Sequence, residues 1–174
     1  GADMSALNGS RIAVIFGIAD NSYDDAETEI KPNIILKRMP SEVPAMLAMK
    51  YGITGSTFNV STACASSAYA AALGKQFIQS GMYDMVIVGG ISNTVSNIVL
   101  SGFNQLLAMS VNPDPATASR PFTKNRDGFI MGEGSGVMVL ESEEHAKARG
   151  AKIHCELAGA SMTCEAHNLT APKT

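Results

Sequence analysis

Thr57-Phe-Asn-Val-Ser-Thr-Ala-Cys-Ala-Ser-Ser67 passes from a strand pattern into a helix pattern, and Cys64 lies at the change. Residues 57–61 alternate as a half-buried β-strand does, and residues 68–80 are typical of a helix. At the N-terminus of a helix, free amide groups and the macrodipole favour an anion, which raises the thiolate fraction of a cysteine and can also hold an oxyanion. Cys64 is therefore the strongest candidate nucleophile, against the alternative of a buried structural cysteine.

The rest of the chain continues this alternation of strands and helices. Short apolar or alternating runs predict further strands at residues 11–17, 85–90, 128–141 and 152–157. The third of these contains several glycines and is predicted as a bent strand pair or one bulged strand. Apolar residues at helical spacing predict helices at residues 42–51 and 95–109. A short charged helix is predicted at residues 142–149, where Ser142 can cap the start, Glu143 and Lys147 are spaced i, i+4, and Gly150 ends the helix. Residues 20–40 are typical of an exposed connection or a poorly anchored helix. The order predicts an α/β protein with its sheet covered by helices.

The composition of the 174 residues excludes several classes of protein. Hydrophobic residues make up 45% and charged residues 17%, as in folded domains. The net charge of −3 makes nucleic acid and an anionic membrane poor partners. No apolar run approaches the ~20 residues that span a bilayer, and no signal peptide pattern is visible, so we expect a cytoplasmic protein. Three cysteines without C-x-x-C spacing predict neither a disulfide framework nor a zinc site.

Two stretches resemble the signatures of the β-ketoacyl synthases, the condensing enzymes of fatty acid and polyketide synthesis. Val60-Ser-Thr-Ala-Cys-Ala-Ser-Ser67 resembles the signature around their active-site cysteine, and residues 124–141 resemble their second signature. Shorter matches follow the family's order over nearly the whole chain, at residues 89–90, 101–103, 118–122 and 144–152. The resemblance is strongest to the discrete type II elongating synthases. It implies a thiolase-like fold, with a mixed sheet covered by helices.

The resemblance also implies a reaction and the residues that serve it. Cys64 would accept an acyl group from the phosphopantetheine thioester of an acyl carrier protein, for decarboxylative condensation with a malonyl thioester on that carrier. Phe103 and Phe129 match positions close to the acyl pocket, and Thr170 matches a hydrogen-bonding contact near the pantetheine channel. No metal and no cofactor other than the carrier's phosphopantetheine is implied. The family's homodimers imply pairing through residues 58–61.

The family pattern is incomplete in this chain. Two histidines and a lysine assist condensation in the family, in motifs of the form His-Gly-Thr-Ser-Thr-Pro and Lys-Ser-x-x-Gly-His, and neither motif occurs here. We therefore expect residues 1–174 to be a partial synthase domain, roughly the N-terminal half, with an irregular or added start at 1–10 and a truncated end at 162–174. Such a chain is not expected to complete condensation alone, because the C-terminal half is missing.

The three histidines present do not replace that pair. His145 is expected to be solvated on a short charged helix, His154 to have a structural or solvent role on the last strand, and His167 to be a weak candidate for a base. Two other functions stay open. One is a non-catalytic partner subunit similar to a chain-length factor, against which the retained Cys64 argues. The other is a thiolase-fold acyltransferase that uses coenzyme A thioesters, against which the second signature argues.

Overall fold

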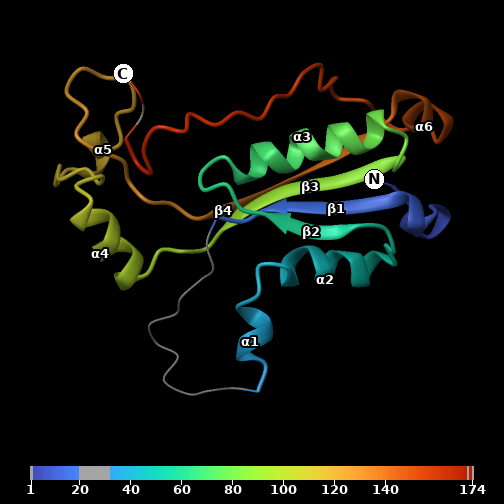
Figure 1. The fold of residues 1–174 in the computed structure, drawn as a ribbon, viewed down its shortest axis with the longest axis horizontal. Helices are drawn as coiled ribbons and strands as arrows, with labels where there is room; N and C mark the ends of the chain where they lie inside the picture. The colour runs from blue at the N-terminus through green and yellow to red at the C-terminus, as the bar shows by residue number, and fades with distance from the viewer. Residues whose placement is uncertain (1, 20–31, 172, 174) are drawn as a thin grey trace.

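The computed structural model describes residues 2–19, 32–171 and 173, and its centre is a four-stranded mixed sheet (Figure 1). The strand order is β2-β1-β3-β4. The strands are β1 (Ile12–Gly17), β2 (Thr57–Val60), β3 (Met85–Ser92) and β4 (Gly134–Glu141). The first three run parallel, and β4 pairs antiparallel with β3, with Val88 opposite Met138. Parallel neighbours need crossover connections, which here contain helices.

Two helices cover opposite faces of the sheet, α2 (Glu42–Tyr51) on one side and α3 (Ser66–Gln79) on the other (Figure 1). Alternate β1 residues enter two different cores. Val14 and Phe16 pack toward α2, whereas Ala13 and Ile15 pack toward α3. Every residue of β1 is buried, which explains why its sequence is continuously apolar rather than alternating.

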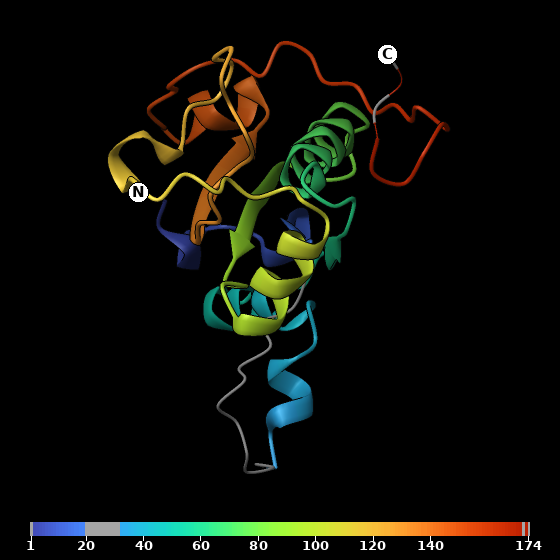
Figure 2. The ribbon, with the colours of Figure 1, turned by 90° about the vertical axis from the view of Figure 1, so that its left-hand side faces the viewer.

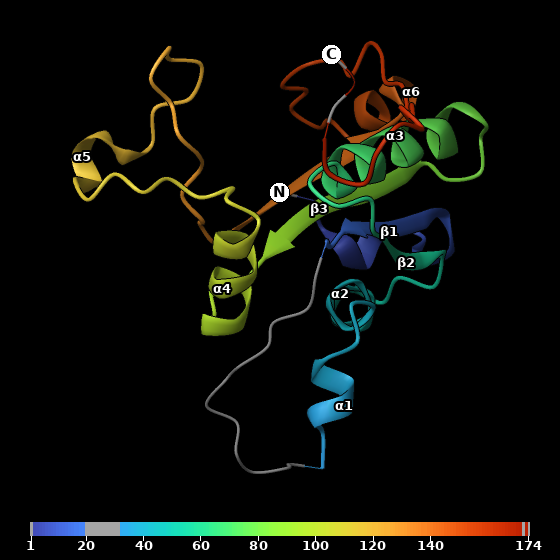
Figure 3. The same ribbon diagram turned by 60° about the vertical axis from the view of Figure 1, so that its left-hand side comes forward.

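The remaining elements are short. They are the 3₁₀ turns η1 (Met4–Ala6) and η2 (Gly9–Arg11) and the helices α1 (Ile34–Lys37), α4 (Asn97–Gln105), α5 (Pro115–Ala118) and α6 (Glu143–Ala148). Figure 2 and Figure 3 show α4 and α5 standing off the end of the sheet at which β3 finishes. The predicted helix end at Gly52 is confirmed by its positive φ of 65°, and Ser142 caps α6 by accepting a hydrogen bond from the His145 amide.

Two predicted elements are shorter than their sequence patterns. The helix predicted at 95–109 is limited to α4, which begins after Ser96, whose side chain accepts a hydrogen bond from the Val99 amide. The strand or strand pair predicted at 128–141 is limited to β4, while Phe129 makes an isolated bridge with Met109. Most of residues 20–40 lie outside the described residues, apart from α1 and its flanks.

The strand predicted at residues 152–157 is wrong. Residues 151–171 contain no helix or strand, and the first part of this segment follows the outer side of α3 (Figure 1). Side chains of α3 hold this segment, because Lys75 donates to the Leu157 carbonyl (2.7 Å) and Tyr69 to the Thr163 carbonyl (2.9 Å). Alternating hydrophobicity suits a strand, but a strand forms only where another strand offers a hydrogen-bonding ladder. His154 is accordingly not part of a strand.

The helices cover less of the sheet than the sequence predicts. Residues 134–139 of β4 are exposed, and Val137, Met138 and Val139 each expose more than half of their surface, at 56%, 54% and 54%. The two covering helices lie over β1, β2 and β3, and only the last residues of β4 reach the core beneath α3, through Leu140. β4 therefore carries more apolar surface than the described residues bury.

Candidate functional site

Cys64 lies on a tight turn between the end of β2 and the start of α3. The turn is strained, because Ala63 has a φ of +50°, a conformation that costs a residue with a side chain about 1–3 kcal/mol. Backbone bonds close it, from the Ala65 amide to the Thr62 carbonyl and from the Ser66 amide to the Ala63 carbonyl. The Cys64 side chain is exposed, which excludes the alternative of a buried structural thiol.

Ser66 completes this turn from inside the protein, a role for which the sequence offered no specific signal. The residue exposes only 3% of its surface. Its hydroxyl accepts a hydrogen bond from the Thr62 amide (2.9 Å) and donates one to the Ala63 carbonyl (2.6 Å). The two bonds span the residues that precede Cys64, and they offset part of the strain at Ala63 because each contributes about 1 kcal/mol net.

Two glycines allow the strands to approach the first turn of α3. A Cβ on Gly17 would lie 2.2 Å from the backbone nitrogen of Ser67, and a Cβ on Gly90 would lie 2.7 Å from the Ser67 Cβ. Real Cβ atoms do not approach other atoms that closely, so glycine is needed at the last residue of β1 and near the end of β3. The ends of β1 and β3 therefore fix where α3 starts, and with it where Cys64 sits.

Cys64 opens onto a mostly apolar cleft of about 940 Å³. Its walls come from α3, the ends of β1 and β3, α4, the segment that leads into β4, and the first part of β4. Lining residues with large apolar side chains include Val99, Phe103, Phe129, Ile130, Met131 and Met138. A cleft of this size and character suits an acyl chain better than a charged or sugar-like ligand.

Phe103 and Phe129, predicted to lie near an acyl pocket, meet in the wall of this cleft. Their ring centroids are 5.2 Å apart and the planes are inclined by 83°, an edge-to-face contact. One ring comes from α4 and the other from the segment before β4. The structure therefore brings both of them to the cleft that contains Cys64, while their contact with a substrate stays a prediction.

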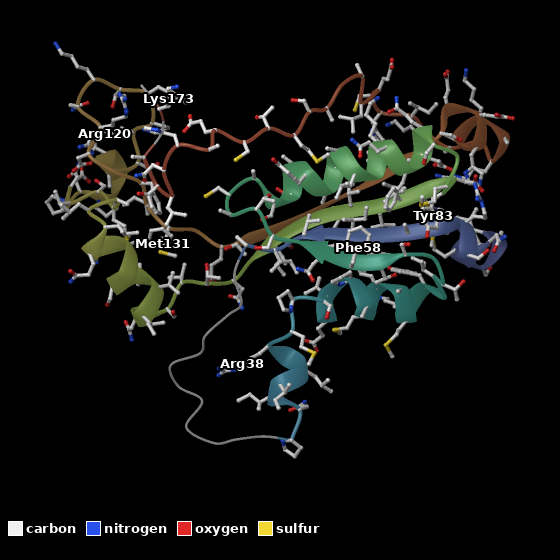
Figure 4. All side chains as sticks on the ribbon, in the orientation of Figure 1. Arg38, Phe58, Tyr83, Arg120, Met131 and Lys173 are labelled. Atoms are coloured by element: carbon white, nitrogen blue, oxygen red, sulfur yellow. The ribbon has the colours of Figure 1, made fainter. Side chains whose placement is uncertain are left out.

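A polar network holds the backbone that carries Phe129. The Phe129 amide donates to the Ala108 carbonyl (3.0 Å), and its carbonyl accepts from the Ser110 amide (3.0 Å). Asp127 accepts from the Ser110 hydroxyl (2.6 Å) and pairs with Arg120 (2.9 Å). The Ser110 hydrogen bond, with help from the Val111 amide and Arg120, keeps the pKa of Asp127 below its ordinary value. Figure 4 shows Arg120 and Met131 at the same end of the molecule, far from Tyr83.

Thr170 does not join the other predicted site residues. It is exposed, and both its amide and its hydroxyl donate to the Asn168 side-chain oxygen, at 2.9 Å and 3.4 Å. It is not among the residues that line the cleft around Cys64. Its proposed contact with pantetheine is therefore a prediction that the geometry of this chain does not support directly.

The histidines, all of them within the described residues, also lie away from the cleft. His154 and His167 are exposed. The expectation that His145 is simply solvated is wrong, because its ring hydrogen-bonds the nearly buried Glu141, which also binds Arg149 through both oxygens (2.6 Å and 2.7 Å). Burial raises the pKa of Glu141, but these hydrogen bonds outweigh it and leave the pKa below its ordinary value.

Metal-binding clusters and membrane-spanning helices are both absent from the described ranges. Within them, no group of three His, Cys, Asp or Glu side chains is arranged to bind a metal ion. No helix in that part of the chain combines the length and apolar character needed to cross a membrane. Cys155 and Cys164 are free and exposed, as Cys64 is, but neither lines the cleft.

Comparison with known proteins points to one family. Residues 1–146 match the family model for the β-ketoacyl synthase N-terminal domain. The chain is 42% identical over 154 residues to chloroplastic 3-oxoacyl-[acyl-carrier-protein] synthase I of Arabidopsis thaliana, covering 88% of this chain and 33% of that protein. It is 37% identical over 171 residues to 3-oxoacyl-[acyl-carrier-protein] synthase 2 of Rhizobium meliloti (strain 1021), covering 95% and 41%. The chain thus spans well under half the length of these relatives.

Solved structures agree with this assignment. A β-ketoacyl synthase from Burkholderia phymatum STM815 superposes with a TM-score of 0.75 at 29% identity, covering 88% of this chain and 40% of that one. A type II polyketide ketosynthase, bound to the hexaketide and in complex with its acyl carrier protein, superposes with a TM-score of 0.76 at 30% identity, covering 89% and 42%. The fold expected from the resemblance, a thiolase-like mixed sheet with helices, is confirmed for the part this chain covers.

Proposed function

The chain belongs to the β-ketoacyl synthase family, and on that premise we propose that Cys64 accepts an acyl group from an acyl carrier protein. The observation that carries the proposal is the position of Cys64, exposed on a strained turn at the start of α3 and opening onto an apolar cleft. A nucleophile must be accessible and held in place, and an acyl chain needs an apolar space beside it. Both conditions are met within this chain.

The proposed first half-reaction is a thioester exchange. The Cys64 thiolate attacks the carbonyl carbon of the carrier's acyl thioester and forms a tetrahedral oxyanion. We propose that the amide of Cys64, which directly precedes the N-cap Ala65 of α3, donates a hydrogen bond to this charge. Collapse of the intermediate breaks the bond to the phosphopantetheine sulfur, which leaves as a thiolate, and the acyl group stays on Cys64.

The proposed second half-reaction needs groups beyond this chain. A malonyl thioester on the carrier loses carbon dioxide, and the resulting carbanion attacks the acyl group on Cys64, so that a carbon–carbon bond forms and the Cys64 thiolate is released. The family motifs that assist this step are absent from residues 1–174, and none of the described histidines lines the cleft. We therefore propose that the chain supplies the acyl-accepting half of a synthase and does not condense alone.

The partners and location are part of the same proposal. An acyl carrier protein is proposed as the donor, supported by the related ketosynthase that was solved in complex with its carrier. Pairing of two copies through residues 58–61 is supported by the position of β2 at the edge of the sheet, where one side of the strand has no ladder in the described chain. A cytoplasmic location stays a prediction, because one relative is named as chloroplastic.

Intact mass spectrometry tests the acyl transfer. The chain is incubated with an acyl-carrier thioester beside Cys64→Ala and beside a Cys155→Ala, Cys164→Ala double variant, which removes the two other exposed thiols. We expect one acyl adduct in the unsubstituted chain and the double variant, and none in Cys64→Ala. An adduct that persists in Cys64→Ala contradicts the proposal, because another residue then accepts the acyl group. No adduct in any chain also contradicts it and favours a non-catalytic partner. Faster transfer from acyl-coenzyme A than from the carrier favours the coenzyme A alternative.

A further inference from the structure

The hydroxyl of Ser66 points away from its own helix. A serine at the start of a helix usually accepts a hydrogen bond from an amide of the first turn. Here Ala65 is the N-cap of α3 and makes no such side-chain bond. The Ser66 hydroxyl instead bonds backward to the Thr62 amide and the Ala63 carbonyl, on the other side of Cys64. Its hydrogen bonds therefore serve the turn that carries Cys64, and not the end of the helix.

The hydrogen bond from the Ser66 hydroxyl to the Ala63 carbonyl determines the direction of the Cys64 amide. That carbonyl and the Cys64 amide belong to one planar trans peptide, so they point to opposite sides of the chain. The carbonyl is held toward the buried side by two donors, the Ser66 hydroxyl (2.6 Å) and the Ser66 amide (3.1 Å). The Cys64 N–H must therefore point away from Ser66, toward the exposed side of the turn.

We propose that Ser66 is a positioning residue that aims the Cys64 N–H at the oxyanion formed during acyl transfer. This inference rests on the proposal that Cys64 accepts an acyl group. It goes further because it names one buried hydroxyl, that of Ser66, as the group that orients the Cys64 N–H. Without this hydroxyl, the carbonyl of the strained Ala63 keeps only the longer bond from the Ser66 amide (3.1 Å), so its peptide plane is held less firmly. An oxyanion donor acts only when it is aimed at the place where the charge develops.

Two reactions of the same thiol separate this role from a general structural one. Acylation by a thioester passes through an oxyanion, whereas alkylation by iodoacetamide displaces iodide and forms no oxyanion. In Ser66→Ala we expect acylation of Cys64 to slow by about tenfold or more, toward the loss seen when an oxyanion donor is removed. We expect alkylation to be unchanged. Ser80→Ala is the matched control, because its hydroxyl also donates to a backbone carbonyl, that of Phe77, at the far end of α3.

A second pair of variants guards against a packing defect at this buried position. Ser66→Thr and Ser66→Val add nearly the same volume and differ in the hydroxyl. We expect Ser66→Thr to acylate faster than Ser66→Val by a factor similar to that between the unsubstituted chain and Ser66→Ala. Equal acylation by the two variants overturns the proposal, whatever the effect of alanine.

The outcomes also separate this inference from the proposed function. If the unsubstituted chain forms no acyl adduct, the proposed function fails, and the positioning role fails with it. If the unsubstituted chain is acylated and Ser66→Ala is acylated as fast, only the role of Ser66 is overturned. If acylation and alkylation slow by the same factor, Ser66 supports the turn without aiming the amide, and the inference is again wrong.

Discussion

Gly17 and Ser67 are in closer contact than any residue with a side chain would allow at position 17. A Cβ added to Gly17 would lie 2.2 Å from the Ser67 backbone nitrogen and 2.4 Å from its Cα. Both atoms belong to the backbone and cannot move aside as the end of a flexible side chain can. The last residue of β1 is thus packed directly on the first turn of the helix that begins beside Cys64.

Gly17→Ala is expected to displace α3 or the end of β1. Overpacking of this kind costs about 1–3 kcal/mol, so the free energy of unfolding in urea should fall by that amount. The rate of Cys64 alkylation should change as well, since the turn moves with the helix. Gly102→Ala is the control, because a Cβ there meets nothing within 4 Å and alanine favours the helix. Equal stabilities for the two variants would contradict the close packing.

Phe103 and Phe129 should couple energetically. An edge-to-face pair contributes about 0.5–1.5 kcal/mol beyond the burial of its rings. Urea unfolding of Phe103→Leu, Phe129→Leu and the double variant measures this coupling as a double-mutant cycle. We expect the double variant to lose less stability than the sum of the single losses, by about 1 kcal/mol. Strictly additive losses would show that the two rings do not interact in solution.

Glu141 should make stability depend on pH in the acid range. Its pKa in the folded chain lies below the ordinary value of 4.5, because the hydrogen bonds from Arg149 and His145 outweigh burial. A carboxylate with a lowered pKa stabilises the fold above its unfolded pKa, and that contribution is lost as the pH falls through the folded pKa. Between about pH 6 and about pH 3.5, the unsubstituted chain should therefore lose more free energy of unfolding than Glu141→Gln.

Glu143→Gln is the control for that experiment. Glu143 pairs with Lys147, and both side chains are exposed, at 72% and 66%. Exposed pairs contribute little, so this variant should follow the pH dependence of the unsubstituted chain. At about pH 6, Glu141→Gln should cost about 2 kcal/mol, as expected for hydrogen bonds to a charged group. If the free energy of unfolding falls equally with acid in all three chains, the Glu141 network is not the source of the pH dependence.

Asp127→Ala should loosen the segment that carries Phe129. The substitution removes the acceptor of the Ser110 hydroxyl and of the Val111 amide, and the partner of Arg120. Hydrogen exchange at the Phe129 amide, which donates to the Ala108 carbonyl, should become faster, while exchange in β1 stays unchanged. Unchanged exchange at Phe129 would mean that the bridge to Met109 holds the segment without the acidic residue.

Much of the architecture followed from residue patterns alone. The strand ending at Gly17, the helix ending before Gly52 and the strand beginning at Met85 lie within one or two residues of their predicted limits. These elements are buried against one another, so their patterns record both the secondary structure and the packing. Residues 152–157 have a strand pattern of the same quality, and they failed as a strand because a ladder needs a neighbouring edge that the pattern does not specify.

The amino-acid sequence by itself determined the order of strands and helices, the place of Cys64 between β2 and α3, and the membership of the family. These are local properties, because periodicity, glycine positions and motifs are written along the chain. Only the tertiary structure decided that Phe103 meets Phe129 in the wall of the cleft, that Thr170 stays outside it, and that the Ser66 hydroxyl faces the Cys64 turn. Distances and hydrogen-bond directions depend on how distant segments pack, and a small polar residue near a helix start has the same sequence signal whichever way it points.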